Sequence, residues 1–144
     1  MIRRFHGHDG AQSLVEFALV LPVILLIITG LFDVARAVWQ ENTLAYAARE
    51  GSRYAIVHGS ASTDPVWPGS PNNNAALRTV VTAAAIGVPN ITTVIAWPSG
   101  GCYDRSCPVS VDVSAPFVPI PSQYLLGSAF QITLRGGSTL VIQR

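Results

Sequence analysis

Hydrophobic and polar residues are distributed very unevenly along this chain of 144 residues. Residues 17–32 read FALVLPVILLIITGLF and contain no charged side chain. With Leu14 and Val15 the run reaches nineteen residues, interrupted only by Glu16. At about 1.5 Å per residue, a helix of this length is roughly 28 Å long, close to the ~30 Å hydrocarbon core of a bilayer. The pattern therefore predicts a transmembrane helix over residues 12–33.

The helical pattern continues beyond this run and becomes amphipathic over residues 34–58. Aromatic residues recur at every seventh position and small residues at every fourth, namely Phe32, Trp39 and Tyr46, and Ala47, Gly51 and Ala55. Each repeat places its side chains on one stripe of a helix, and the small stripe allows another element to approach closely. The first strong stop is the sequence at His58, Gly59 and Ser60. We therefore expect one helix from about Ser13 to Val57.

Residues 59–144 have the pattern of a small α+β domain. A loop rich in Ser, Pro, Gly and Asn is followed by a short helix at Ala75–Ile86, which Asn74 can cap. Gly136 and Gly137 favour a two-residue hairpin between the last two strands. Residues 118–122, VPIPS, are expected to form a loop between the second and third strands. Four strand-like runs are expected, at Ile91–Trp97, Val109–Ser114, Phe130–Arg135 and Ser138–Ile142.

These elements together predict the fold class. A sheet with one apolar face must bury that face against another element, and the amphipathic part of the long helix is the available partner. We expect an α+β fold in which a long N-terminal helix, first transmembrane and then amphipathic, packs on a small antiparallel sheet.

Composition and charge are typical of a membrane protein, and they indicate on which side of the membrane its N-terminus lies. Only 12% of the residues are charged, against about 25% in ordinary soluble domains. The formal net charge of +1 offers no basic surface for nucleic acid, so we expect no nucleic-acid partner. Arg3 and Arg4 precede the apolar run, which favours a cytoplasmic leader over residues 1–11 and an extracytoplasmic domain over residues 59–144.

The N-terminal half carries a resemblance to a known family. Residues 10–22 read GAQSLVEFALVLP, and this segment is similar to the TadE-like family of tight-adherence (Flp-type) pilus assembly proteins. The resemblance continues through residues 30–37 and 47–55, and it resumes more weakly at residues 109–117 and in the last strands. It implies a type IV pilin-like fold and a minor pilin or pseudopilin, held in the cytoplasmic (inner) membrane by its helix. Other pilin-like subunits and pilus assembly proteins are the implied partners, besides the lipid bilayer.

The resemblance also implies processing by a prepilin peptidase on the cytoplasmic face. The family's usual cut follows a glycine and leaves glutamate as the fifth mature residue. A cut after Gly10 makes Glu16 the sixth residue, whereas a cut after Ala11 makes Gln12 the first and Glu16 the fifth. The bond that is cut, and whether the mature chain enters the filament, stay open at this point.

Glu16 is the residue of the apolar run with the clearest chemistry. A carboxylate inside a membrane span is a functional-site hypothesis, since Asp at a helix centre carries an insertion penalty of about 2.5–3.5 kcal/mol. The resemblance assigns Glu16, Phe17 and Pro22 to assembly, with Glu16 pairing with the amino terminus of a neighbouring subunit. The alternative is a carboxylate near the helix N-terminus, favoured by the helix dipole and reaching the headgroups.

Other polar residues indicate structure rather than catalysis. Cys102 and Cys107 favour a disulfide outside the cytoplasm, with free thiols and a zinc site as the alternatives. The leader histidines His6 and His8 are too few for a metal site. We find no catalytic constellation, and we expect no enzyme activity, no cofactor and no metal.

A second interpretation of the N-terminus is a Sec signal peptide. Two arginines, an apolar core and the A-x-A sequence at residues 35–37 would then direct a secreted or periplasmic binding protein. Against this, the helical pattern crosses Ala37 without a break.

Asp33 and Arg36, at i and i+3, either pair within the helix or bridge two subunits, and we favour the intrahelical pair.

Overall fold

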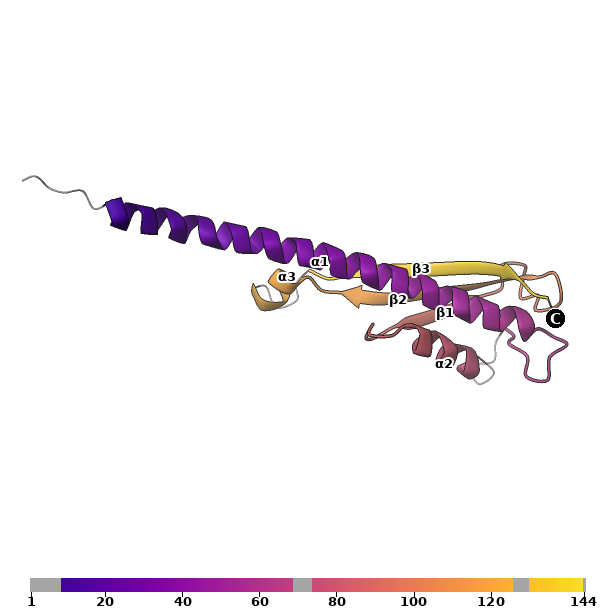
Figure 1. Cartoon of the computed structure of the whole chain (residues 1–144). Helices are drawn as coiled ribbons and strands as arrows, with labels where there is room; N and C mark the ends of the chain where they lie inside the picture. Colours follow the sequence, from indigo (N-terminus) through magenta and orange to yellow (C-terminus); the bar gives the residue numbers. More distant parts are fainter. Residues whose placement is uncertain (1–8, 69–73, 126–129, 144) are drawn as a thin grey trace, which may run out of the picture.

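One long helix and a small α+β domain form the molecule in the computed structural model, which describes residues 9–68, 74–125 and 130–143. Helix α1 (Asp9–Val57) contains 49 residues. It ends where the sequence predicts and begins four residues earlier than Ser13. Its first half extends beyond the domain, and its second half lies along the sheet (Figure 1). The helix continues through Pro22 without a break.

The sheet has three antiparallel strands in the order β1-β2-β3. They are β1 (Thr92–Ala96), β2 (Pro108–Phe117) and β3 (Ile132–Val141). Helix α2 (Ala75–Ala84) packs against α1, and a six-residue helix, α3 (Ile120–Leu125), connects β2 to the segment before β3. The predicted α+β fold class, a long N-terminal helix on an antiparallel sheet, is confirmed.

The predicted hairpin at Gly136 and Gly137 is wrong. One continuous strand, β3, runs through both glycines, with Gly136 opposite Val113 and Gly137 opposite Asp112. An ideal Cβ on Gly136 would lie 2.5 Å from the carbonyl carbon of Leu44. Gly136 therefore allows α1 to pass close to the sheet, because a side chain at this position would clash with the helix backbone. The two expected C-terminal strands form one strand, β3.

Three further local predictions need correction. The segment around Ile120 was expected to be loop, yet it forms α3, where Pro121 suits the first helical turn. Asn74 is the residue before α2, but its backbone is already in the right-handed helical region and its side chain makes no capping hydrogen bond. Helix α2 also ends two residues before the predicted Ile86.

The core lies between the second half of α1, the sheet and α2. The small-residue stripe of α1 is buried as predicted, and an ideal Cβ on Gly51 would lie 2.6 Å from Cγ2 of Val81 on α2. The predicted alternation along β2 is also confirmed, because every second residue is fully buried. These fully buried residues are Val109, Val111 and Val113.

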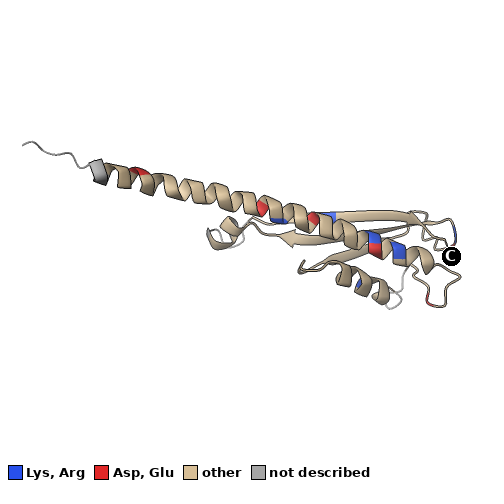
Figure 2. Cartoon of the chain, in the orientation of Figure 1, with Lys and Arg blue, Asp and Glu red and all other residues tan. Residues whose placement is uncertain are grey.

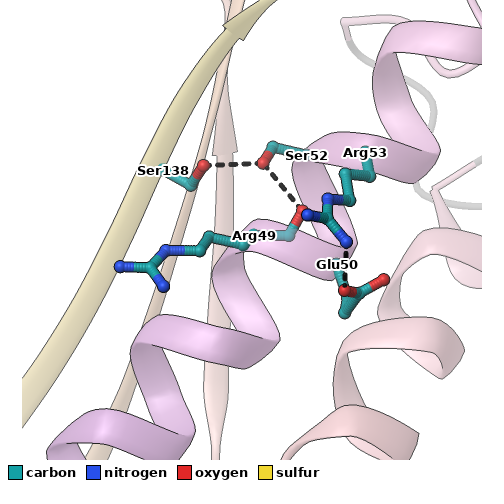
Figure 3. A network of polar contacts seen from close by, with 5 residues as sticks. All are labelled: Arg49, Glu50, Ser52, Arg53 and Ser138. Carbon is teal, nitrogen blue, oxygen red and sulfur yellow. Dashed lines mark hydrogen bonds and ion pairs between the residues drawn. The ribbon is translucent and has the colours of Figure 1, made fainter.

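Polar contacts fix the position of α1 on the sheet. The hydroxyls of Ser52 on α1 and Ser138 on β3 lie 2.7 Å apart, and Ser52 also donates to the carbonyl of Arg49 (Figure 3). On the outer side of the helix, Nη1 of Arg53 lies 3.0 Å from Oε1 of Glu50 and forms an ion pair with it. The two serines link α1 to β3 across the buried face, and Gln40 of α1 also donates from Nε2 to the backbone carbonyl of Pro116 on β2 over 3.2 Å.

Candidate membrane and assembly interface

The described part of the structure leaves most of the first half of α1 uncovered, and α3 borders only residues 22–29 of it. Every large apolar side chain from Leu14 to Phe32 is exposed, and no residue of the most apolar stretch is buried. The helix is long and apolar enough to cross a membrane, which is typical of a single-pass anchor or of a signal sequence. An exposed apolar surface of this extent needs lipid or other apolar helices around it.

Glu16 lies on this exposed segment, close to its N-terminal end. Gln12 donates a hydrogen bond from Nε2 to Oε1 of Glu16 over 3.2 Å. No charged residue separates Glu16 from Asp33, and Figure 2 shows the corresponding part of α1 without charge colours. Glu16 is therefore the one acidic side chain of residues 14–32, and its carboxyl group can accept hydrogen bonds on an otherwise apolar part of the helix.

The other residues assigned to processing and assembly occupy different places on α1. The backbones of Gly10, Ala11 and Gln12 belong to its first turn, and residues 1–8, which include the leader arginines and histidines, lie outside the described residues. Phe17 is exposed directly beside Glu16. Pro22 lies further along and lines a groove shared with α3.

Asp33 and Arg36 connect the apolar half of α1 to the domain. The predicted intrahelical pair is present, with Nη1 of Arg36 3.2 Å from Oδ1 of Asp33. Asp33 is only 7% exposed, and its second carboxylate oxygen accepts a hydrogen bond from the backbone N–H of Ile120 over 2.9 Å. The guanidinium of Arg36 also lies 5.2 Å from the ring centroid of Phe117, in a cation–π arrangement.

Sequence reasoning missed the contact between Asp33 and Ile120. The two residues are 87 positions apart, and no local pattern joins them. The only sequence signal was the acidic residue at the end of the apolar run, which the pairing with Arg36 already explained. The structure therefore gives Asp33 a second role, in which it holds the first turn of α3 against α1.

Two hollows of opposite character flank α3. The apolar groove is lined on α1 by Pro22, Leu25, Leu26 and Thr29, and on the α3 side by Ile120, Pro121 and Tyr124. The hydroxyl of Thr29 donates to carbonyls of its own helix, so it leaves no unpaired donor there. The other hollow, called the polar cleft because Arg36, Gln40 and Gln123 line it, also has apolar residues in its wall, including Trp39, Pro89 and Phe117.

The far end of the domain contains the predicted disulfide. Cys102 and Cys107 are bonded, with their Cα atoms 5.8 Å apart. The backbone N–H of Ile142 donates to the carbonyl of Cys107, and the N–H of Ser106 donates to the carbonyl of Ile142, so the bridged loop also holds the chain after β3. Nearby, burial raises the pKa of Tyr54, and the carboxylate of Asp64 raises it further. Among the described residues, no group of His, Cys, Asp and Glu could hold a metal ion.

Comparison with known protein families gives a match within helix α1, the element that carries the exposed apolar surface. Residues 11–53 match the family of TadE-like proteins. No curated protein and no solved structure matches the chain. The match begins at the first turns of α1 and ends just beyond the Ser52 contact with β3, so it covers both the exposed apolar half and most of the sheet-bound half. Over this long N-terminal helix, the chain is similar to TadE-like proteins.

Proposed function

We propose that the protein is a membrane-anchored, pilin-like subunit for assembly of a tight-adherence (Flp-type) pilus, acting as a minor pilin or pseudopilin. One observation carries the proposal: a single unbroken helix has an exposed apolar surface in its first half and packs one face against a sheet in its second half. Such a helix can exchange lipid for neighbouring helices while the domain stays folded, because the core uses only the second half.

The arrangement supports a defined topology in the inner membrane. The leader, residues 1–11, lies in the cytoplasm, residues 12–33 cross the membrane, residues 34–58 continue the helix, and residues 59–144 form the extracytoplasmic domain. The disulfide agrees with an oxidising compartment outside the cytoplasm. The function is structural, and the proposal includes no catalytic step.

Glu16 would act in assembly after the prepilin peptidase has removed the leader. In an apolar environment, a free amino terminus of a neighbouring subunit would be attracted strongly to this carboxylate, since little water screens the charges. Gln12 occupies one carboxylate oxygen and leaves the other available as an acceptor. The pair would set the axial register between subunits, and Phe17 would pack beside it.

The signal-peptide alternative conflicts with the contacts at the outer end of the span. Cleavage after Ala37 would remove Asp33 and Arg36 from the domain. The backbone N–H of Ile120 would lose its acceptor, and the ring of Phe117 would lose the guanidinium above it. These contacts support a helix that stays whole in the mature protein.

N-terminal sequencing of the mature protein tests the proposal directly. A start at Ala11 or Gln12 supports processing by a prepilin peptidase, whereas a start at Val38 would contradict it in favour of secretion. An unprocessed Met1 would indicate a resident component of the assembly machinery instead.

The role of Glu16 is tested with a matched pair of variants. Glu16→Ala should leave the protein in the membrane fraction and abolish its recovery in sheared pili. Glu41→Ala removes an exposed acid from the same helix outside the apolar run, and it should leave both readouts unchanged. Normal pilus output from the Glu16 variant would refute the assembly role.

A further inference from the structure

We infer that α3 is an interfacial membrane helix: it lies in the outer headgroup region of the bilayer and fixes the depth at which α1 crosses it. The inference rests on the membrane-anchoring part of the proposed function. It goes beyond that function, because it gives the extracytoplasmic domain its own contact with lipid.

The first argument is the position of α3 along α1. The apolar groove is formed jointly by α3 and by residues 22–29 of α1, which belong to the transmembrane stretch. Figure 1 shows α3 extending from the end of β2 along the part of α1 that projects from the domain. If Leu25 and Leu26 contact lipid, Tyr124 across the groove must lie at nearly the same depth.

The second argument is the separation of polar and apolar surfaces around α3. Pro121 and Tyr124 face the apolar groove, whereas Gln123 lines the polar cleft that contains Arg36 and Gln40. This division is expected of a helix that lies in the plane of the interface, with one side in the headgroup and acyl boundary and the other in water. In this orientation, the guanidinium of Arg36 on the polar side lies at the depth of the phosphates of the lipid headgroups.

The third argument is the composition of the chain around α3. No charged residue occurs between Asp112 and Arg135, although the domain carries charges elsewhere. Within this stretch Tyr124 is 79% exposed and Phe130 is 64% exposed. Exposed aromatic side chains in an uncharged segment are typical of the membrane–water interface.

Backbone chemistry limits how deep this region can go. The described chain between β2 and α3 is irregular, and hydrocarbon offers its backbone groups no hydrogen-bond partner, so α3 must lie at the surface of the core rather than inside it. The outer boundary of the hydrocarbon region then lies near Thr29, four residues before Asp33. Of the proposed membrane-crossing residues 12–33, residues 30–33 then lie in the headgroup region and residues 12–29 cross the hydrocarbon core, over a length of about 27 Å that fits the ~30 Å core.

A second copy of the chain could cover the same groove, and the test distinguishes the two occupants. Lipid is favoured because the groove is continuous with the lipid-exposed side of the span, and because α3 changes from apolar to polar across its own width. The change from apolar to polar surface on α3 occurs near the end of the apolar run of α1. A membrane surface requires this coincidence, whereas a protein partner does not.

Spin labels on single cysteine variants of the full chain test the inference in vesicles of phosphatidylcholine and phosphatidylglycerol. Tyr124→Cys reports on α3, Val20→Cys on the span, and Tyr46→Cys is the control, an exposed tyrosine on α1 about 26 Å beyond Thr29. The native disulfide keeps its two cysteines from reacting. The measured quantity is the ratio of collision rates with oxygen and with a water-soluble nickel complex.

The expected ratio at Tyr124 is several-fold above that at Tyr46 and below that at Val20. A ratio equal to that at Tyr46 overturns the inference. A low ratio together with spin–spin broadening at Tyr124, removed by dilution with unlabelled chain, also overturns it and assigns the groove to a second copy. A water-like ratio at Val20 would instead refute the membrane anchor itself, so the two failures are distinguishable.

Discussion

Replacing Gly136 by alanine tests the closest approach between α1 and the sheet. An ideal Cβ at this position would lie 2.5 Å from the carbonyl carbon of Leu44 and 2.6 Å from the Cα of Ala45. Both are backbone atoms of α1, so no side-chain rotation can relieve the clash. The backbone of Gly136 is not in the left-handed region, which means that the requirement for glycine is one of space.

The magnitude follows from the shortfall in contact distance. Carbon atoms pack best about 3.5–4.0 Å apart, so α1 would have to move away from β3 by about 1 Å. Overpacking in a core costs about 1–3 kcal/mol, and a clash between two backbones belongs at the upper end. Alanine in a strand recovers about 0.5–1 kcal/mol relative to glycine. We therefore expect a net loss of about 2 kcal/mol, using the upper end of that overpacking range.

Gly137→Ala is the matched control, because the two glycines are neighbours on opposite faces of β3. Its ideal Cβ would meet only the carboxylate of Asp112, whose exposed side chain can rotate away. Thermal and urea unfolding of the full chain in detergent micelles would be followed by tryptophan fluorescence and near-UV circular dichroism. About 2 kcal/mol corresponds to a drop in Tm of roughly 10 °C for a domain of this size. Equal midpoints for the two variants would refute the close-approach argument.

Three other substitutions test single contacts. Asp33→Ala leaves the backbone N–H of Ile120 without its acceptor and should destabilise the domain by about 1–3 kcal/mol, with faster proteolysis around α3; an unchanged digestion pattern would contradict this. Ser52→Ala should cost about 1 kcal/mol in urea unfolding, and a gain in stability would show that the hydroxyl contact with β3 is unfavourable. Cys102→Ser should lower the stability by about 2 kcal/mol under non-reducing conditions. Adding reductant to both proteins should make their stabilities equal. Mass spectrometry of the parent chain should show a mass increase of two hydrogens on reduction, located at Cys102 and Cys107.

Much of the fold could be predicted because it is encoded locally. The length of α1, its change from wholly apolar to amphipathic and the burial of its small-residue stripe all follow from the spacing of residues within one helix. The alternation along β2 likewise predicts which side faces the core. In the candidate interface, the exposed apolar run with Glu16 and the pair of Asp33 and Arg36 are local patterns of the same kind.

The elements that were missed depend on contacts between distant parts of the chain. Gly136 and Gly137 suit both a tight turn and a close approach, and only the position of α1 over β3 decides between them. Helix α3 was expected to be loop, since its six residues are too few to show a period. Its first turn is held by Asp33, 87 residues away.

The sequence alone thus determined a membrane-type helix, its amphipathic continuation, a disulfide and the likeness to TadE-like proteins, because each rests on residues close together in the chain. Tertiary structure alone decided that the paired glycines belong to one strand, that Asp33 holds α3, and that α3 lies beside the apolar half of α1. The physical reason is the same in each case: these features depend on how closely α1 approaches the sheet and on what its outer end contacts, and both are properties of packing.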